Sequence, residues 1–253
     1  MEKTLSASQI KKIRSLQQKK FRLETSLFVV EGEKLVEEAL RSGFEVDGVY
    51  RSDEIGEKAM ERISSLSSPS PVLAVLKQRK FKLGDLRLEK GRLYLILDGV
   101  KDPGNMGTII RLADWFGVSA VFCSNDCVEL YNPKTVQATM GAIFRVPVVY
   151  CNLAAVIRDA SSNGIPVYGT FLDGKPVNEE FCSKASKGSV IVLGSESNGI
   201  SEELSSMIKK EMHVLIPSFD VSGMAKAARS DGGSESLNVA TACAAILSLI
   251  RAR

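Results

Sequence analysis

Short, wholly apolar segments alternate with longer amphipathic ones along this chain of 253 residues, and this alternation constrains the fold more than any other feature. LYLIL (93–97) and VIVLG (190–194) contain no charged side chain and are almost entirely apolar. Strands that are buried on both faces have this pattern, and they are typical of parallel sheets covered by helices. We therefore predict an α/β protein whose larger part is a mostly parallel sheet with helices on both faces.

The predicted elements of this larger part begin at residue 93. The strands are expected near 93–97, 119–123, 166–170, 189–193 and 212–216. The helices are expected near 105–116, 133–140, 152–163, 201–209 and 235–250.

The first 90 residues show a second, smaller set of elements. Helices are expected at 6–18, 31–43 and 57–66, and strands at 28–30, 46–50 and 71–77. The polar stretch 82–91 ends in glycine just before the first long apolar strand, which is typical of a joint between domains. We predict a small α/β domain over 1–88 and a second domain over 89–253.

The composition restricts the function classes. There is no apolar run of 18 residues, and the polar, basic N-terminus lacks the apolar core of a secretory signal. We expect no membrane association and a cytoplasmic location. The five cysteines are odd in number and stand mostly in apolar runs, which favours reduced, buried thiols over a zinc site.

Positive charge is concentrated at the N-terminus. Residues 1–22 contain one acid, Glu2, and seven basic residues: Lys3, Lys11, Lys12, Arg14, Lys19, Lys20 and Arg22. Such a cluster neutralises phosphates and binds nucleic acid in a salt-dependent way. A helix face that only promotes solubility would have the same composition, so both interpretations stay open here.

Three segments could carry chemistry. In the first, LDGVKDPGNMGTIIRLADWFG (97–117), a strand leads through a turn into a helix, where ligands bind in α/β sheets. Asn105 is expected to cap that helix, and Arg111 suits a phosphate.

The second segment, VIVLGSESNGIS (190–201), has Glu196 where a dinucleotide-binding turn would have glycine. A carboxylate there repels a pyrophosphate. It suits a ligand with a positively charged sulfonium and ribose hydroxyls, or it orders the loop by hydrogen bonds. In the third, HVLIPSF (213–219) is followed by GGSESLNVATACAAILSLI (232–250), where Ser234 or Ser236 is expected to cap the last helix.

Other chemistries have no sequence support. His213, the single histidine, begins an apolar strand, which leaves serine and cysteine triads without a base. The sequence contains neither a GxxxxGK[ST] phosphate loop nor an HExxH metal motif. We therefore expect no metal.

Taken in order, the three segments resemble the motifs of the SpoU (TrmH-type) RNA methyltransferases of the SPOUT superfamily. The first motif is similar to Asp102-Pro103-x-Asn105-x-Gly107-x-Ile109-x-Arg111, and the second to Gly194-x-Glu196-x-x-Gly199. The third is similar to Ile216-Pro217 with Ser236-Leu237-Asn238-Val239, and 132–148 is a further family-like stretch. The first 90 residues resemble the ribosomal-protein-like RNA-binding domain that several members carry.

This resemblance implies a trefoil knot in the second domain, S-adenosylmethionine as methyl donor, a ribose 2′-hydroxyl of RNA as acceptor, and a homodimer. Ribosomal RNA is the favoured substrate. The implied donor-binding residues are Gly194, Gly199, Ile216, Leu237 and, more weakly, Thr170. The implied substrate and catalytic residues are Asn105, Arg111, Glu196, Ser236 and Asn238.

The family assigns removal of the hydroxyl proton to the arginine of the first motif, here Arg111. Because a guanidinium is normally protonated, we prefer that Arg111 anchors the adjacent phosphate, which takes or relays the proton, and that Asn105 orients the ribose. Transfer RNA methylation and a non-catalytic RNA-binding protein are the alternatives. A nucleotide-binding oxidoreductase is disfavoured because the three-glycine fingerprint is missing.

The sequence departs from the family between the two parts of the third motif. Pro217 and Ser236 are separated by an insertion, 219–233, whereas close relatives have only a few residues there. Lys226 and Arg229 of this insertion could reach RNA, or the insertion could be a plain surface loop. Its presence puts the placement of Ser236 and Asn238 relative to Ile216 in doubt.

Overall fold

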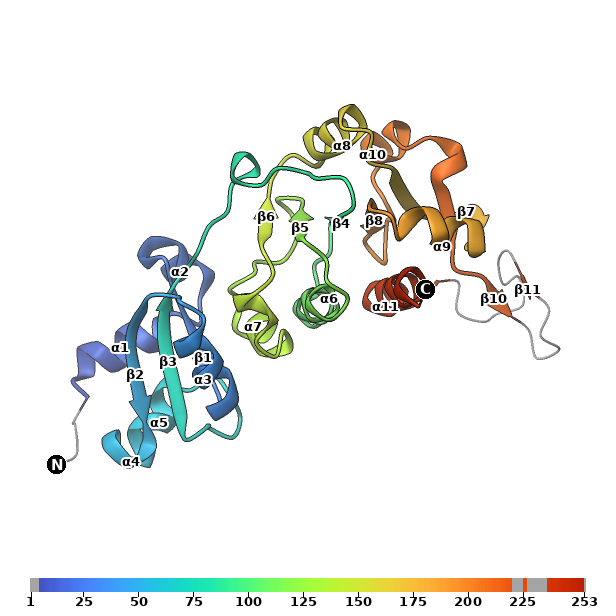
Figure 1. Cartoon of the computed structure of the whole chain (residues 1–253). Coiled ribbons are helices and arrows are strands. Elements are labelled where there is room, and N and C mark those ends of the chain that lie inside the picture. The colour runs from blue at the N-terminus through green and yellow to red at the C-terminus, as the bar shows by residue number, and fades with distance from the viewer. Residues whose placement is uncertain (1–4, 220–224, 227–235, 253) are drawn as a thin grey trace. The chain divides into compact units, whose positions relative to one another are not determined.

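The protein divides into two compact units (Figure 1). A computed structural model describes residues 5–219, 225–226 (backbone only) and 236–252. The first unit comprises residues 1–80 and 129–145, and the second comprises 81–128 and 146–253. The domain boundary predicted between residues 88 and 89 stays a prediction, because a division into compact units does not show which part of the chain folds independently.

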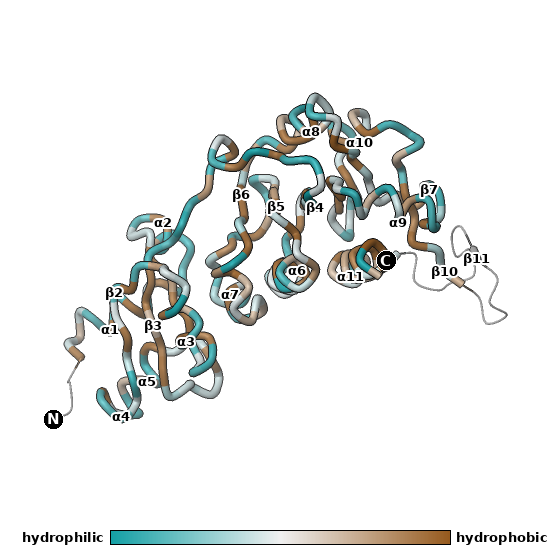
Figure 2. The backbone as a smooth tube through the Cα atoms, in the orientation of Figure 1, coloured by the Kyte–Doolittle hydropathy of each residue, from teal (hydrophilic) through white to brown (hydrophobic). Residues whose placement is uncertain are grey.

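A three-stranded antiparallel sheet with strand order β1-β3-β2 forms the centre of the first unit. Its strands are β1 (Leu27–Glu31), β2 (Val46–Arg51) and β3 (Val72–Lys77). Residues 72–76 of β3 are all buried, and this stretch is brown in Figure 2. Burial on both faces requires cover on both sides of the central strand.

Helices α1 and α5 pack together and share a core with the sheet, and α3 packs against β1 and β3. Helix α1 begins where the sequence predicts, because Ser6 and Gln9 form a reciprocal capping box. The helices of this unit are α1 (Ala7–Ser15), α2 (Lys19–Thr25), α3 (Glu33–Arg41), α4 (Ser52–Ile55), α5 (Glu57–Ile63) and α7 (Pro133–Ala138), with the 3₁₀ turn η2 (Ala142–Phe144).

The segment 129–145 belongs to the first unit although it connects two strands of the second. Its helix α7 packs against β1. The ring of Tyr131 lies 4.4 Å from that of Phe28, and its hydroxyl donates to the carbonyl of Arg79 at 2.6 Å. Phe144 meets Phe44 edge to face. These contacts join residues 52 to 103 positions apart in sequence, and no local pattern indicates them.

The second unit is built on a six-stranded, wholly parallel sheet with strand order β6-β5-β4-β8-β7-β9. The predicted α/β class with a parallel sheet is confirmed. The strands are β4 (Leu93–Asp98), β5 (Ala120–Cys123), β6 (Val148–Tyr150), β7 (Val167–Pro176), β8 (Ser189–Gly194) and β9 (His213–Leu215).

Helices cover both faces of this sheet, as predicted (Figure 1). Helices α8 and α10 share one core with alternate residues of β4, β5 and β8. Helices α6 and α11 lie side by side against the other face, where Arg251 of α11 donates to the carbonyls of Phe116 and Gly117 that end α6. The helices are α6 (Pro103–Trp115), α8 (Leu153–Ser162), α9 (Glu179–Ala185), α10 (Glu202–Met207) and α11 (Val239–Arg251), with the 3₁₀ turns η1 (Leu83–Asp85) and η3 (Lys210–Met212).

The short elements α2, α4, α9 and β6 were not predicted, because three to seven residues carry little periodic signal. Strand β7 continues beyond residue 170, with a register shift between Thr170 and Lys175. A separate pair, β10 (Ser218–Phe219) and β11 (Ala225–Lys226), lies in the inserted segment. The rest of the insertion, including Arg229, lies outside the described residues, as does Ser234, so the expected knot stays a prediction.

All five cysteines are free thiols, and four of them are buried, as the sequence indicates. Within the described residues, no helix is long and apolar enough to cross a membrane. The same part of the chain contains no group of three or more acidic, histidine or cysteine side chains placed to hold a metal ion.

Candidate active site

The three candidate segments meet at one edge of the parallel sheet. Asp98 and Gly194 are paired at the carboxyl ends of the neighbouring strands β4 and β8. Thr170 of β7 pairs with Val214 of β9 on the far side of β8. The loops that follow β4, β8 and β9 therefore leave the sheet at its carboxyl edge, where open α/β sheets bind ligands.

Side chains from all three segments form one hydrogen-bonded cluster, which we call the polar triad: Asn105, Glu196 and Asn238. The amide of Asn105 donates to the carboxylate of Glu196. The amide of Asn238 donates to Asn105 Oδ1 at 3.0 Å and to Glu196 Oε1 at 3.2 Å. The structure thus brings together three predicted site residues that lie 42 to 133 positions apart in sequence.

The ends of two helices hold the two amides in place, in a way that corrects the predicted caps. Helix α6 is capped by Asp102 rather than Asn105, and Asp102 Oδ1 accepts from the backbone N–H of Asn105 at 2.8 Å. Helix α11 is capped by Asn238 rather than Ser236. Its Oδ1 accepts from two backbone N–H groups, which leaves its NH₂ free to donate to the triad.

Both cap errors have a physical origin. Asp102 directly precedes Pro103, and proline is favoured at the first helical position after a cap, a signal that could have identified Asp102. For α11, several Ser and Asn residues stand close together, and any of them is a good cap by type. Only the packed position of the helix decides among them.

Glu196 is presented by a tight loop after β8. The loop closes through two backbone hydrogen bonds between Ser195 and Gly199, of 3.1 and 2.9 Å. Gly199 has a φ of +64°, which favours glycine. A Cβ on Gly194 would lie 2.0 Å from the carbonyl carbon of Gly199, so the loop packs directly on this backbone.

The substitution Gly194→Ala is therefore expected to displace the loop that carries Glu196. Overpacking of this kind costs on the order of 1–3 kcal/mol in stability, and we expect both S-adenosylmethionine binding and methyl transfer to weaken. Calorimetric titration with the donor and a methylation assay measure the two effects. Gly84→Ala is the matched control, because a Cβ there meets nothing within 4 Å; equal behaviour of both variants would contradict the prediction.

The other predicted donor-binding residues follow the same edge. Thr170 ends the regular part of β7, where its hydroxyl donates to the carbonyl of Val192 at 3.2 Å. Ile216 directly follows β9 and is half-buried. Leu237 directly precedes the cap of α11, with 47% of its surface exposed.

Arg111 and Ser236 stay outside the polar triad. Arg111 lies on α6 six residues after Asn105, and its side chain is exposed. Ser236 is exposed near the start of α11. Within the described residues, neither side chain is hydrogen-bonded to the triad.

A second set of contacts, which sequence reasoning missed, supports the loop after β4. Gly99 N–H donates to Ser124 Oγ at 2.9 Å, and Val100 N–H donates to Cys127 Sγ at 3.2 Å. A hydrogen bond with Cys123 is the main cause that lowers the pKa of the Cys127 thiol to about 7. Cys127 is thus a buried structural acceptor beneath the first motif.

Comparison with known proteins places this architecture in a family. Residues 92–224 match the SpoU rRNA methylase family, and residues 7–78 match the MRM3-like substrate-binding domain. The chain belongs to the SpoU rRNA methylase family. The expected class, an S-adenosylmethionine-dependent RNA 2′-O-ribose methyltransferase with an N-terminal RNA-binding domain, is confirmed.

Individual relatives extend over almost the whole chain. The 23S rRNA (guanosine(2553)-2′-O)-methyltransferase RlmP of Bacillus subtilis is 31% identical and covers 96% of this chain and 95% of its own. An AdoMet-bound rRNA methyltransferase from Sinorhizobium meliloti is 32% identical, with a TM-score of 0.83 over 100% of this chain and 97% of its own. AviRb from Streptomyces viridochromogenes is 19% identical, has a TM-score of 0.79 over 98% of both chains, and shows the fold alone.

Proposed function

We propose that this enzyme methylates a ribose 2′-hydroxyl of 23S ribosomal RNA, and that the polar triad with Arg111 forms its substrate face. The observation that carries the proposal is the hydrogen-bonded meeting of Asn105, Glu196 and Asn238, one residue from each family motif. The similarity to RlmP over 96% of the chain favours large-subunit ribosomal RNA. A cytoplasmic location is proposed together with that substrate.

The residues at the sheet edge suit S-adenosylmethionine. This donor has no phosphate, so it needs no glycine-rich phosphate loop, and its positive charge is compatible with the carboxylate of Glu196. Gly194, Gly199, Thr170, Ile216 and Leu237 would hold it from strands β7 and β8, the segments after β8 and β9, and the residues just before α11. The bound donor supplies an electrophilic methyl group.

The chain's own residues then position the acceptor. Glu196 accepts hydrogen bonds from both amides of the triad, which fixes the Asn105 amide with its oxygen toward Asn238. Asn105 so oriented holds the ribose, and Ser236 adds a hydroxyl beside Asn238. Arg111 binds the adjacent phosphate with two parallel hydrogen bonds. That phosphate takes or relays the hydroxyl proton while the oxygen forms its bond to the methyl carbon and the carbon–sulfur bond breaks, since a protonated guanidinium cannot accept the proton.

Mapping ribose methylation in total RNA from cells with and without the gene tests this function. We expect one or a few 23S rRNA positions to lose their 2′-O-methyl group and to regain it when the wild-type gene is restored. If methylation is lost only in transfer RNA, the substrate is transfer RNA and not ribosomal RNA. No change in any RNA, together with RNA binding by the purified protein, would favour a non-catalytic RNA-binding role.

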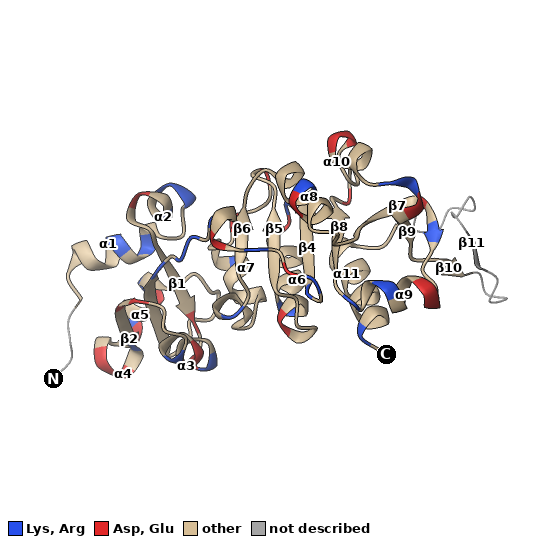
Figure 3. Cartoon of the chain, turned by 45° about the horizontal axis from the view of Figure 1, so that its top comes forward, with Lys and Arg blue, Asp and Glu red and all other residues tan. Residues whose placement is uncertain are grey.

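The N-terminal basic cluster is proposed as part of the RNA-binding surface. Lys11, Lys12, Lys19 and Lys20 are exposed on and beside α1 and α2, where blue marks Lys and Arg in Figure 3. Arg22 has to be removed from the cluster, because its side chain is buried and paired with Glu129. The match to a substrate-binding domain over 7–78 supports the assignment.

Replacing these four lysines with alanine is expected to weaken RNA binding and to reduce the dependence of log K on log salt concentration. Each lost phosphate contact lowers the slope by about 0.7–0.9. Filter binding of an rRNA fragment at several salt concentrations measures it. Alanine substitutions of Lys58 and Lys184 are the control for positive charge lost elsewhere on the protein. If the slope of log K against log salt concentration is unchanged in the quadruple variant, the cluster promotes solubility and does not bind RNA.

We propose that a second copy of the chain covers the adjacent ends of α6 and α11. Trp115 at the end of α6 is 82% exposed, and Leu249 near the end of α11 is 41% exposed. The bonds from Arg251 to Phe116 and Gly117 hold these two ends together. Apolar side chains this exposed favour an interface rather than solvent.

A Trp115→Glu variant is therefore expected to be monomeric in light scattering under conditions where the wild-type protein is dimeric. A buried charge at a symmetric interface is repeated on both subunits and repels its copy. Leu23→Glu, at an apolar side chain that is 51% exposed in the first unit, should leave the dimer intact. A wild-type monomer, or a Trp115→Glu dimer, would exclude this interface.

A further inference from the structure

Asp98 links the loop that leads into the helix of Asn105 to the loop that carries Glu196. It is the last residue of β4, and its Oδ2 accepts a hydrogen bond of 2.7 Å from the backbone N–H of Ser201, which lies 103 positions later. Ser201 is the N-cap of α10, directly after the loop of Glu196. None of the proposed catalytic roles uses this carboxylate.

The loop of Glu196 needs such an anchor at its second end. Its first end is held by strand β8, and the Ser195–Gly199 bridge closes it on itself. The bridge fixes the shape of the loop, but it does not determine how the loop stands relative to β4. Beyond the bridge, the hydrogen bond from Ser201 to Asp98 ties the end of the loop to the neighbouring strand.

Asp98 is itself held rigidly. Its backbone belongs to the sheet, where it pairs with Gly194. The next two N–H groups, of Gly99 and Val100, donate to Ser124 and Cys127. Four residues further on, Asp102 caps the helix of Asn105. The carboxylate therefore lies where the loop after β4 begins and where the Glu196 loop ends.

We propose that Asp98 is a positioning residue for methyl transfer: it holds the Glu196 loop at the distance from α6 at which Glu196 accepts the amide of Asn105. The proposal rests on the proposed function, because the geometry it maintains is that of the polar triad. A group on a loop requires support of this kind, since a shift of about 1 Å at a reacting centre can lower a rate on the order of 100-fold.

Two variants separate positioning from simple folding. Asp98→Asn keeps an oxygen that can accept from Ser201, whereas Asp98→Ala removes the acceptor. We expect Asp98→Ala to lower kcat on the order of 10- to 100-fold with little change in the KM for RNA, and Asp98→Asn to restore most of the rate. Asp159→Ala, at an exposed acid on α8, is the matched control with wild-type kinetics.

A measurement independent of activity uses the side-chain amide of Asn105. In NMR spectra of the full-length protein, its NH₂ resonances should move in Asp98→Ala and stay near their wild-type positions in Asp98→Asn. Amide hydrogen exchange at Ser201 should be faster only in the alanine variant. Unmoved Asn105 resonances or wild-type kcat in Asp98→Ala would overturn the proposal, as would equal loss of kcat in both variants.

Failure of the proposed function has a different signature. If the wild-type enzyme does not methylate ribosomal RNA, that function is wrong, whereas the NMR and exchange results still report whether Asp98 positions the Glu196 loop. If the wild-type enzyme is active and the kcat of Asp98→Ala equals its kcat, only the positioning role of Asp98 is wrong, and the proposed function stands.

Discussion

Replacing Arg111 with alanine is expected to lower methyl transfer on the order of 100-fold or more while S-adenosylmethionine binding is retained. The side chain is exposed on α6 and is not hydrogen-bonded to the polar triad, so its loss leaves the triad and the donor loops unchanged. In the proposed mechanism, the substitution removes the charged anchor for the phosphate next to the reacting ribose. Removing one preorganised donor to a developing charge typically costs about 10²–10³-fold in rate.

Single-turnover methylation of an rRNA fragment and calorimetric binding of the donor together test this expectation. Arg111→Lys keeps the charge but loses the two parallel hydrogen bonds, so it should recover only part of the rate. Arg158→Ala, at an exposed arginine on α8, is the control and should be fully active. A wild-type rate in Arg111→Ala would rule out the phosphate-anchor mechanism. Loss of S-adenosylmethionine binding in this variant would instead assign Arg111 to the donor-binding residues.

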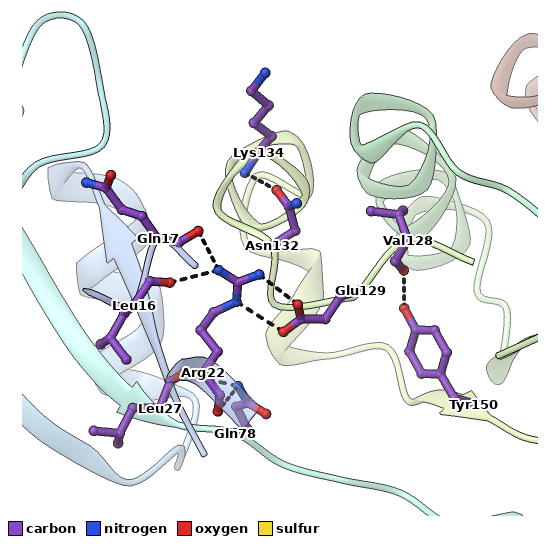
Figure 4. Close-up of polar contacts among 10 residues, drawn as sticks. All are labelled: Leu16, Gln17, Arg22, Leu27, Gln78, Val128, Glu129, Asn132, Lys134 and Tyr150. Atoms are coloured by element: carbon purple, nitrogen blue, oxygen red, sulfur yellow. Dashed lines mark hydrogen bonds and ion pairs between the residues drawn. The ribbon is translucent and has the colours of Figure 1, made fainter. Parts of the chain in front are cut away.

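The second large effect is expected at Glu129, where substitution by alanine should destabilise the first unit by about 3–5 kcal/mol. Arg22 is only 2% exposed. Its guanidinium donates to both carboxylate oxygens of Glu129, at 3.1 and 2.7 Å, and to the carbonyls of Leu16 and Gln17, both at 2.8 Å (Figure 4). Removing Glu129 leaves this cation buried with only two carbonyl acceptors.

Urea unfolding of the full-length protein measures the loss. Glu37→Ala is the control: Glu37 pairs with Arg41 on the surface of α3, with side chains 59% and 78% exposed, and such pairs contribute about 0.3–0.5 kcal/mol. The double substitution Arg22→Met with Glu129→Leu should recover most of the stability, because it removes both charges and keeps apolar volume. A loss in Glu129→Ala no larger than in the control would show that the pair does not hold 129–145 to the first unit.

Local patterns predicted much of the fold. The strands LYLIL and VIVLG became β4 and β8 at the centre of the sheet, because wholly apolar segments are stable only where both faces are covered. Helix α1 begins at Ala7, within one residue of the start predicted for the helix over 6–18, and the structure shows Ser6 and Gln9 as its capping box. The ordered motifs also predicted Asn105, Glu196 and Asn238, which the structure brings into contact. The catalytic and binding roles of these three residues stay predictions, as do those of Arg111, Ser236 and the donor-binding residues.

Other features depend on contacts that no short window contains. In the sequence, Arg22 belongs to the basic N-terminal cluster that suits phosphates. Its side chain is nevertheless buried, because it pairs with Glu129, which lies 107 positions later in the chain. The segment 129–145 follows a strand of the catalytic sheet, and its packing on β1 and its contacts with Arg79 and Phe44 place it in the other unit. The cap of α11 was mispredicted by two residues for the same reason, whereas the neighbouring Asp102 and Pro103 could have identified the cap of α6.

The sequence by itself therefore determined the class of fold, the methyltransferase family and the three segments of the site, because periodicity and ordered motifs are local properties of the chain. Only the tertiary structure decided which side chains of those segments meet, which arginine is withdrawn from solvent, and that Asp98 anchors the Glu196 loop. Each of these depends on the distance between groups that are far apart in sequence, and that distance is set by the packing of the whole unit.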